Sequence, residues 1–490
     1  MSGPDFPGAT VLSSDSRYAA LCTGFNQRFS GTPAYVQVCG SPGQVVDAVQ
    51  SAIRNGLRPT VRSGGHCYEG FVTDGAGAII DLSPMNSVYQ DLGMDGAFCV
   101  EAGCTLWDVY TQLYRQYGLT IPGGSCYSVG AGGHICGGGY GLLSRKFGLV
   151  VDYLCAIEVV CVSAQGNASL ILASPSSPDP EIQALFWAHT GGGGGNFGVV
   201  TRYWFAPDLP QAPAVATLSS VAWNWSGFTF AQFSRLLQNF GAFFAEHSAP
   251  DDPYRDLFSL LHLTKNAAPQ IVMVTQYVGN DLTLLDDFLA AISNGVGAHV
   301  PQAAPVGHHL LVAQQDGYRT MPWLEATQTL NGSGPNRRGK YKSAYMIQPF
   351  PDNQIAAIWN ALTDPTFQNA SALLQVDSYG CEVNARASSD TAVPQRSSIM
   401  KLQYQAYWNS AGDDASNLNW IRTFYQSVYA DTGGEPISNS VTDGCFVNYC
   451  DTDLADWPSL YYKDNYARLL DVKTFWDPRN IFNHAQSIGS

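Results

Sequence analysis

Two glycine-rich stretches decide how this chain is interpreted: residues 62–67 read RSGGHC, and residues 122–130 read PGGSCYSVG. Each places a strong nucleophile, His66 or Cys126, in a loop whose glycines lack a Cβ and tolerate positive φ. Such loops let the backbone approach a flat ligand closely, and an imidazole nitrogen and a thiolate can both bond covalently to one ring system. Taken singly, His66 is an ordinary loop histidine and Cys126 a buried thiol. Taken together, they predict a doubly tethered planar ligand.

A third glycine-rich stretch, residues 130–141, reads GAGGHICGGGYG. Closely spaced glycines expose backbone N–H groups, which can bind the phosphates of a nucleotide without a lysine. The alternative is a tightly turning loop, but the density of glycines favours a nucleotide. Residues 191–200 read GGGGGNFGVV and contain a Gly-x-Gly-x-x-Gly pattern. This run follows a helix-like segment and leads into a strand, which reverses the order of a Rossmann site, so we exclude a Rossmann dinucleotide site.

The composition excludes several classes of function. The 490 residues carry a formal net charge of −15, whereas nucleic-acid binding needs clustered lysine and arginine. The sequence contains no run of about 18 apolar residues, so we predict no membrane span. The twelve cysteines include no Cys-x-x-Cys pair, so we expect buried thiols in a reducing setting and no metal site. Residues 1–26 lack a basic region followed by an apolar one, which predicts a cytoplasmic rather than a secreted protein.

Hydrophobic periodicity predicts an α+β fold in which the chain changes character twice. Residues 1–205 have the pattern of a nucleotide-binding domain, with strands at 34–39, 58–61, 78–82, 97–101 and 156–162 and helices at 43–55 and 105–117. Thr105 is the expected N-cap of the second helix. Residues 206–440 predict an antiparallel-sheet domain, with strands at 271–278 and 401–408 and helices at 230–246 and 282–292. Residues 441–490 return to the first domain, and 471–483 are expected to form a helix followed by a turn.

Together these motifs resemble the flavoproteins of the vanillyl-alcohol-oxidase fold, in their berberine-bridge-enzyme-like branch. The matching stretches are residues 61–66, 122–126, 132–141, 185–200, 448–454, 461–466 and 476–480. They cover the first 205 and the last 50 residues in order, while the middle of the chain matches mainly by position. The resemblance is closest to doubly tethered sugar oxidases such as the hexose oxidases of glycopeptide-antibiotic biosynthesis.

The resemblance implies that FAD is the cofactor, bonded through its 8α carbon to His66 and through its C6 to Cys126. It implies an FAD-binding domain of the vanillyl-alcohol-oxidase type beside an antiparallel-sheet substrate domain. Two bonds fix the flavin ring and favour hydride acceptance. The other residues expected to contact the cofactor are Arg62, Ser63, Gly64, Gly65, Gly123, Gly124, Val129, Gly130, Gly132, Gly133, His134, Gly137, Gly138, Tyr140, Gly141, Gly198, Val199, Asn448 and Tyr449.

Three tyrosines are the expected catalytic residues. Oxidation of an alcohol carbon needs a base for the hydroxyl proton, and the resemblance implies Tyr449 in that role. The chain departs from the family motif at the aromatic position three residues before Tyr449. That position is Phe446 here, and phenylalanine cannot act as a base. Tyr140 is expected beside the flavin, and Tyr379 is expected to lower the pKa of Tyr449 by hydrogen bonding to its anion. Each tyrosine on its own also fits a core aromatic residue.

Two glutamines are the expected substrate contacts, together with Tyr379. Gln403 and Gln405 share one face of a predicted strand, so both face the cavity if either does. The alternative is a solvated sheet face. In the family, small residues after the cysteine loop accompany oxygen access to the flavin. Val129 and Ala131 are small, which favours an oxidase over a dehydrogenase.

The function implied is oxidation of a sugar alcohol, with O₂ reduced to hydrogen peroxide, by a bacterial tailoring enzyme. The preferred substrate is C6 of an N-acylglucosamine unit on a glycopeptide antibiotic, converted through an aldehyde to a carboxylate. The alternatives are oxidation of free oligosaccharides at C1 and oxidation of an anthracycline or polyketide sugar. A ring-closing amine oxidation is disfavoured because no carboxylate is evident at the base position. A different class of function is an inactive flavin-binding partner protein, and either a monomer or a dimer fits the sequence.

Overall fold

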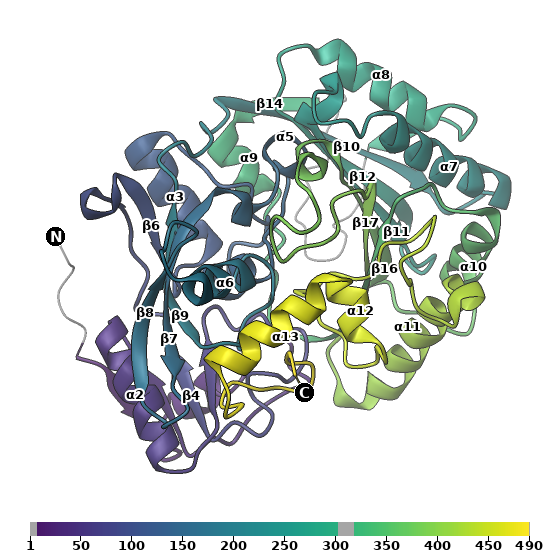
Figure 1. Ribbon diagram of the computed structural model, residues 1–490. Helices are drawn as coiled ribbons and strands as arrows, with labels where there is room; N and C mark the ends of the chain where they lie inside the picture. Colours follow the sequence, from purple (N-terminus) through teal and green to yellow (C-terminus); the bar gives the residue numbers. More distant parts are fainter. Residues whose placement is uncertain (1–6, 302–317, 490) are drawn as a thin grey trace.

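The computed structural model describes residues 7–301 and 318–489, and its strands form three sheets (Figure 1). The first sheet has the order β1 (Ala9–Val11), β2 (Tyr35–Val38), β4 (Ala78–Asp81), β3 (Pro59–Arg62). β2 and β3 are both parallel to β4. Helix α2 (Pro42–Arg54) runs between β2 and β3, and the Ser41 side chain accepts the Gln44 N–H as its N-cap. The predicted strands at 34–39 and 58–61 and the helix at 43–55 agree with these elements to within two residues.

The second sheet is antiparallel and completes the first region of the chain. Its order is β5 (Val88–Asp91), β6 (Ala97–Glu101), β9 (Val199–Phe205), β7 (Leu154–Val162), β8 (Ala168–Ala173). Helix α3 (Leu106–Tyr117) begins with a capping box, in which Thr105 and Asp108 satisfy each other's backbone N–H groups. Thr105 is therefore the N-cap that the sequence predicted.

The third sheet has eight antiparallel strands and forms the substrate-side half of the molecule. Its order is β13 (Val300–Pro301), β10 (Val215–Asn224), β12 (Gln270–Tyr277), β11 (Leu257–Thr264), β16 (Ala372–Ser378), β17 (Met400–Trp408), β15 (Arg338–Met346), and β14 (Tyr318–Pro322) also pairs with β10. Helices α7 (Phe230–Glu246), α8 (Leu282–Ser293), α10 (Asp352–Thr363) and α11 (Asp414–Val428) lie on its outer side in Figure 1. The predicted α+β fold with an antiparallel substrate sheet is confirmed. Within the described residues, none of the helices has the length and apolar character that crossing a membrane requires.

The end of the chain packs against the first region. Helix α13 (Asn465–Trp476) contacts α6 (Pro180–Ala188), and the two lie side by side in Figure 1. The helix followed by a turn that was predicted over 471–483 is present, but the helix already starts at Asn465 and stops at Trp476. It stops there because the carboxylate of Asp477, followed by Pro478, accepts the backbone N–H groups of Ile481 and Phe482. We propose residues 206 and 440 as the limits of the substrate domain, because the end of the chain packs against the first region.

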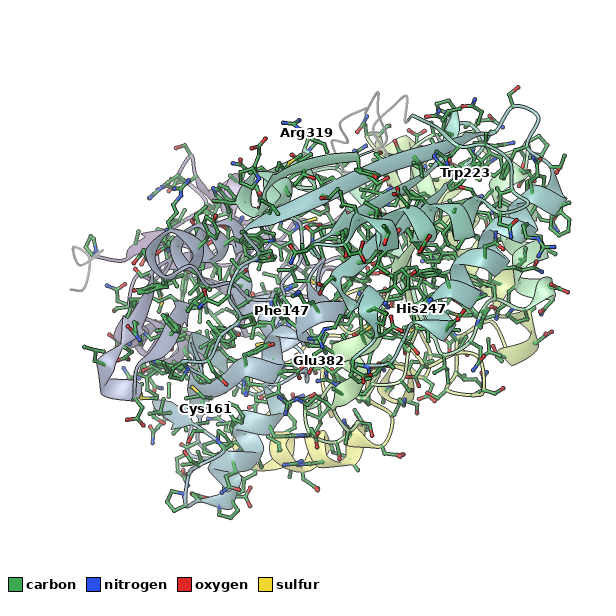
Figure 2. The ribbon with its side chains drawn as sticks, turned by 90° about the horizontal axis from the view of Figure 1, so that it is seen from above. Phe147, Cys161, Trp223, His247, Arg319 and Glu382 are labelled. Carbon is green, nitrogen blue, oxygen red and sulfur yellow. The ribbon has the colours of Figure 1, made fainter. Side chains whose placement is uncertain are left out.

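A buried arginine holds the two halves together. Arg145 of α5 (Ser144–Phe147) is 1% exposed. Its Nε donates to the Leu257 carbonyl at 2.9 Å and its Nη2 to the His247 carbonyl at 2.7 Å, and its Nη1 donates to the Tyr379 carbonyl. In Figure 2, Phe147 at the end of α5 lies near Glu382 of η4 (Cys381–Ala385). Because all these carbonyls belong to the substrate half, Arg145 joins the two regions through hydrogen bonds to the backbone.

Replacement of this arginine should destabilise the protein strongly. Arg145→Ala leaves several buried carbonyls without a donor, each costing about 1–3 kcal/mol. We expect the free energy of unfolding to fall by about 3 kcal/mol or more, measured by chemical denaturation. Arg319→Ala is the control, because Arg319 forms an ion pair with Glu325 in which both side chains are about half exposed, 51% and 49%. That variant should lose less than about 1 kcal/mol, and equal losses in the two variants would contradict the role given to Arg145.

Candidate active site

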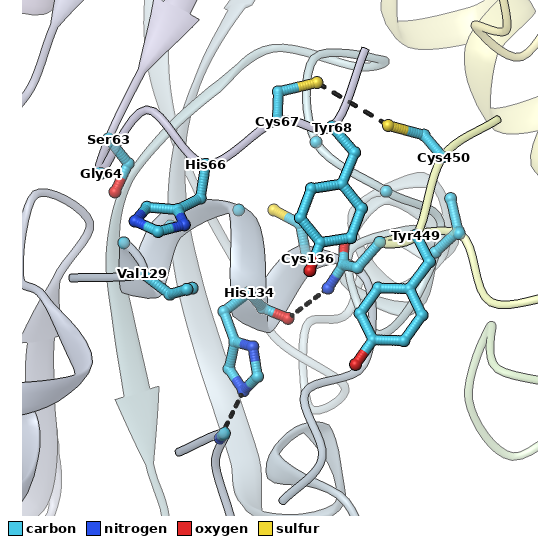
Figure 3. A pocket seen from close by; sticks show the side chains of 18 of the residues that line it. Ser63, Gly64, His66, Cys67, Tyr68, Val129, His134, Cys136, Tyr449 and Cys450 are labelled. Atoms are coloured by element: carbon cyan, nitrogen blue, oxygen red, sulfur yellow. Dashed lines mark hydrogen bonds between the residues drawn. The ribbon is translucent and has the colours of Figure 1, made fainter. Parts of the chain in front are cut away.

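A cavity of about 340 Å³ lies where the glycine-rich loops meet the substrate sheet (Figure 3). This volume is within the range typical of small-molecule sites. Its lining brings together both nucleophiles, the glycine-rich stretches, the C-terminal segment around Tyr449, and strands β11, β16 and β17. The predicted site residues that line it are Arg62, Ser63, Gly64, Gly65, His66, Gly124, Cys126, Val129, Gly130, Gly132, Gly133, His134, Tyr140, Gly141, Gly198, Gln403, Gln405, Asn448 and Tyr449.

Five predicted site residues lie outside this lining: Gly123, Gly137, Gly138, Val199 and Tyr379. Gly137 has a supporting position, since a Cβ there would lie 2.1 Å from Oδ1 of Asn448. The Asn448 amide in turn donates to the His134 carbonyl at 3.0 Å. Val199 is displaced by strand alternation, because its neighbours Gly198 and Val200 face the cavity.

The two nucleophile loops touch through their glycines. A Cβ on Gly64 would lie 2.3 Å from the backbone nitrogen of Gly130, and a Cβ on Gly130 would lie 2.1 Å from the nitrogen of Gly64. No side chain fits at that separation, so both positions need glycine. The contact brings the loop that carries His66 against the loop that carries Cys126.

His66 is held in one tautomer by two serines. Its ring stacks on Phe25 at 4.4 Å, and its Nε2 lies 2.8 Å from Ser128 Oγ. The Ser128 hydroxyl donates its hydrogen to Ser333 Oγ at 2.9 Å, so it accepts one from the histidine. Burial, with a smaller contribution from the Arg62 charge, lowers the pKa of His66 to about 4. The imidazole is therefore neutral near pH 7, with its hydrogen on Nε2 and a free lone pair on Nδ1.

Cys126 lines the same cavity as His66, but its pKa is shifted in the opposite direction. Burial raises the pKa of its thiol to about 11. The cysteine is therefore a protonated thiol near pH 7, and its chemistry depends on what the cavity holds. His66 and Cys126 face one cavity, as the sequence predicted, from the two loops that meet at Gly64 and Gly130.

Tyr449 begins a hydrogen-bonded series that ends on a carboxylate. Its hydroxyl lies 2.8 Å from the Tyr140 hydroxyl, which donates to Oδ2 of Asp377 at 2.6 Å. Burial raises the pKa of Tyr449 well above its ordinary value, and the nearby Asp377 charge adds to this, while the hydrogen bond between Tyr449 and Tyr140 lowers it. Burial also raises the pKa of Asp377, so its carboxylate has an increased proton affinity.

The expected role of Tyr379 needs correction. Its side chain interacts with that of Tyr345, whose ring centroid lies 5.5 Å away, and its ring packs at a centroid distance of 6.1 Å against Tyr140, which lines the cavity. The hydrogen bond to Tyr449 that was expected from Tyr379 is made by Tyr140. Asp377, two residues before Tyr379, lines the cavity with Leu373 and Gln375 as alternate residues of β16, whereas Tyr379 lies beyond the end of that strand.

Lys401 is a second group that the motifs did not reveal. Its Nζ lies 3.2 Å from the ring centroid of Tyr140, 3.8 Å from that of Phe446 and 3.9 Å from that of Tyr449. Among the described residues it has no hydrogen-bond acceptor. Burial lowers the pKa of Lys401, and the Asp377 charge opposes that shift. A positive charge here would interact favourably with all three aromatic faces and with a phenolate. The signal in the sequence was a lysine in phase with Gln403 and Gln405.

The glutamines form a buried polar ladder on the sheet. Gln405 Nε2 donates to Gln403 Oε1 at 2.9 Å and to Gln375 Oε1 at 3.2 Å, and Gln375 Nε2 donates to Oδ1 of Asp377 at 2.8 Å. Gln403 Nε2 donates to the Tyr68 hydroxyl at 3.0 Å. Gln403 and Gln405 are 5% and 4% exposed, so the alternative of a solvated sheet face does not hold. Gln375 was missed, although it lies directly across from Gln403 in the strand register.

The residues present suit a flat nucleotide cofactor such as FAD. A Cβ on Gly133 would have no neighbour within 4 Å, and one on Gly194 would meet only Cys136 at 4.0 Å, so side chains there would project into the cavity. Bare backbone at these places leaves N–H groups and space for phosphates. His66 and Cys126 supply two groups able to bond the ring system.

Comparisons with known proteins agree with this arrangement. A family model described as an FAD binding domain matches residues 33–168, and one described as berberine and berberine like matches residues 445–489. The aclacinomycin-N/aclacinomycin-A oxidase of Streptomyces galilaeus is 42% identical, over 97% of this chain and 88% of its own length. The hexose oxidase of Chondrus crispus is 38% identical, over 99% and 95%.

A solved structure of a glycopeptide hexose oxidase complexed with teicoplanin is 41% identical and superposes with a TM-score of 0.92. The superposition covers 99% of this chain and 100% of that one. Identity at this level over nearly the whole length leaves no part of the substrate sheet unmatched. The chain belongs to the berberine-bridge-enzyme-like branch of the FAD-linked oxidases, whose members here oxidise carbohydrate and natural-product substrates.

Proposed function

We propose that this FAD-dependent oxidase holds its flavin by two covalent bonds, from His66 to the 8α carbon and from Cys126 to C6, and oxidises an alcohol carbon of a sugar. The observation that carries the proposal is the convergence of His66, Cys126 and the Tyr449–Tyr140–Asp377 series on one cavity. When bound, FAD supplies a hydride acceptor and passes the electrons to O₂, which leaves as hydrogen peroxide.

The chain's own groups handle the substrate's proton. Tyr449 is the proposed base for the substrate hydroxyl. It accepts that proton as its own passes to the Tyr140 oxygen and the Tyr140 proton passes to Oδ2 of Asp377, along contacts of 2.8 and 2.6 Å. This relay lets a phenol of raised pKa act as a base near neutral pH, because no free phenolate has to accumulate. When protonated, Lys401, which lies over both tyrosine rings, would favour the charged states.

The proposed substrate is a sugar on a larger natural product, with O₂ as the second partner, in the bacterial cytoplasm. The buried ladder of Gln375, Gln403 and Gln405 offers amide donors and acceptors for hydroxyl groups. The preferred position is C6 of an N-acylglucosamine unit on a glycopeptide, oxidised through the aldehyde to the carboxylate. The likeness to a glycopeptide hexose oxidase complexed with teicoplanin supports this choice.

The second candidate substrate is an anthracycline sugar, supported by the 42% identity with an aclacinomycin oxidase. Peroxide release measured with a panel of substrates distinguishes these two candidates from each other and from free oligosaccharides oxidised at C1. Teicoplanin-type glycopeptides, aclacinomycins and free oligosaccharides should each be tested with the holoenzyme, and products identified by mass spectrometry. Turnover of free oligosaccharides alone would overturn the preferred substrate.

The tether assignment is tested by denaturing the holoprotein in acid. His66→Ala and Cys126→Ala should each keep flavin attached through the remaining bond, with an altered absorbance spectrum. The double variant should release all of its FAD, because neither bond can form. Intact and peptide mass spectrometry provides the measurement. Flavin still attached to the double variant would show that another residue forms the bond.

The base assignment is tested by Tyr449→Phe. The variant keeps the ring that packs beside Tyr68 at 5.5 Å but loses the proton-accepting oxygen. We expect full flavin attachment and a fall in kcat of roughly 100-fold or more. Stopped-flow reduction of the flavin under anaerobic conditions measures the affected step. A near-normal reduction rate would rule out Tyr449 as the base.

The role of Tyr140 is tested through the pH dependence of kcat/KM. In Tyr140→Phe the hydrogen bond that lowers the pKa of Tyr449 is lost and the Tyr449 proton has no path to Asp377, so Tyr449 must ionise alone at a pKa raised further. The acid limb of the profile should therefore move to higher pH, with activity recovering as the pH rises. Tyr379→Phe is the matched control, since the Tyr379 side chain interacts with Tyr345, and its limb should stay in place. A shift in the control but not in Tyr140→Phe would reverse the assignment.

A further inference from the structure

We propose that Cys67 and Cys450 form a redox-active thiol pair, which hydrogen peroxide arising in the cavity oxidises to a disulfide. The pair is a modification site separate from the proposed flavin tether at Cys126. Its oxidant is the product of the proposed oxidase reaction, so in the cell the proposal rests on that function. The chemistry of the pair itself can be examined with added peroxide.

The geometry already pairs the two sulfurs. Cys67 Sγ and Cys450 Sγ lie 3.8 Å apart, and both residues line the cavity (Figure 3). A disulfide needs about 2.0 Å between the sulfurs, so a closure of less than 2 Å is required. Both cysteines are free thiols, and they come from segments 383 positions apart in the chain.

A buried ion network holds these two segments facing each other. Lys340 Nζ lies 2.5 Å from Oε1 of Glu69 and 2.6 Å from Oδ1 of Asp451. Glu69 is two residues after Cys67, and Asp451 is the residue after Cys450. Because breaking a buried pair of charges is costly, the lysine keeps the two loops close and the thiols opposed. The pair therefore needs no large movement of the backbone to react.

The two thiols differ in acidity, as expected when one attacks the oxidant and the other then attacks the oxidised sulfur. The hydrogen bond from the Cys450 thiol lowers the pKa of Cys67, the backbone N–H groups of Glu69 and Phe71 lower it further, and burial opposes them. Cys450 has a raised pKa. The other ten cysteines also have raised pKa values. Since the thiolate is the reactive form, Cys67 is the cysteine best suited to attack a peroxide.

The reaction balances with peroxide as the sole oxidant. The Cys67 thiolate attacks one peroxide oxygen, the O–O bond breaks, and the hydroxide released takes up a proton to become water. The Cys450 sulfur then attacks the Cys67 sulfenic acid, the S–O bond breaks, and a second water leaves with the Cys450 proton. Two thiols and one peroxide thus give one disulfide and two waters. The bond would link the residue after His66 to the residue after Tyr449.

The experiment follows the oxidation state of each cysteine in the holoenzyme. One sample receives hydrogen peroxide, and a second receives the turnover substrate and O₂ with excess catalase, which removes peroxide from bulk solution. Both are denatured in N-ethylmaleimide and digested without reductant. We expect the peptides of Cys67 and Cys450 to appear cross-linked in both samples, lighter by two hydrogens, and to separate on reduction. Cys136 is the control, since it lines the same cavity but lies 2.9 Å from the Tyr203 hydroxyl. It should remain fully alkylated.

Two single-cysteine variants test which of the two thiols attacks peroxide first. In Cys450→Ser the sulfenic acid at Cys67 has no thiol to resolve it, so dimedone should label Cys67 under peroxide. In Cys67→Ser, Cys450 should stay unlabelled. Alkylation of both cysteines after peroxide treatment, with no dimedone adduct in Cys450→Ser, would overturn the proposal. A parallel substrate sample without catalase that yields no peroxide contradicts the proposed function instead, because the added-peroxide sample reports on the thiols independently. A cross-link formed by added peroxide but not during peroxide-yielding turnover would overturn the link to the enzyme's product.

Discussion

The backbone contact between Gly64 and Gly130 is the constraint on which the rest of the cavity depends. At separations near 2 Å between a built Cβ and the opposing nitrogen, no residue with a side chain fits at either position. The contact aligns the loop after β3, a strand of the first sheet, with the loop before α4 (Ala131–Cys136), and through them it aligns His66 with Cys126. The substrate sheet then closes the same space from the other side, joined to the first region by Arg145. A small number of backbone contacts therefore determines where the two proposed covalent bonds can form.

Burial acts in opposite senses on the groups within this space. It lowers the pKa of His66 and Lys401, and it raises those of Cys126, Tyr449 and Asp377. All five shifts favour neutral forms, because a dry cavity penalises charge. Under the proposed mechanism, the hydrogen-bonded series of two tyrosines and an aspartate compensates for this by moving protons between neighbours. The proposed reactivity, that of the Cys67 and Cys450 thiols included, therefore depends on proton transfer or attack between adjacent groups.

The sequence predicted the fold and the loops that line the cavity well, because both depend on local patterns. Glycine runs, the Thr105 cap and strand alternation at Gln403 and Gln405 are readable from neighbouring residues. Asp377 and Lys401 were missed because their partners are remote in the chain: Asp377 meets Tyr140 across 237 positions. Tyr379 was preferred to Tyr140 as the partner of Tyr449 for the same reason, since no local pattern reports which tyrosine faces inward. The thiol pair was likewise invisible, because Cys67 and Cys450 meet only through tertiary packing.

The serine that orients His66 carries an implication for how the protein is made. Ser128 can accept the Nε2 hydrogen because its own is taken by Ser333, and Ser333 lies in the loop after α9 (Trp323–Thr329), in the substrate half. The imidazole is therefore presented with its Nδ1 lone pair free only after that half has docked. A nascent chain that had folded its glycine-rich region alone would contain the nucleophile in an undefined tautomer. Under the proposed attachment, the covalent bonds to FAD therefore form after the two halves have assembled. A polypeptide that carries covalently bound flavin is then one that has completed its tertiary structure.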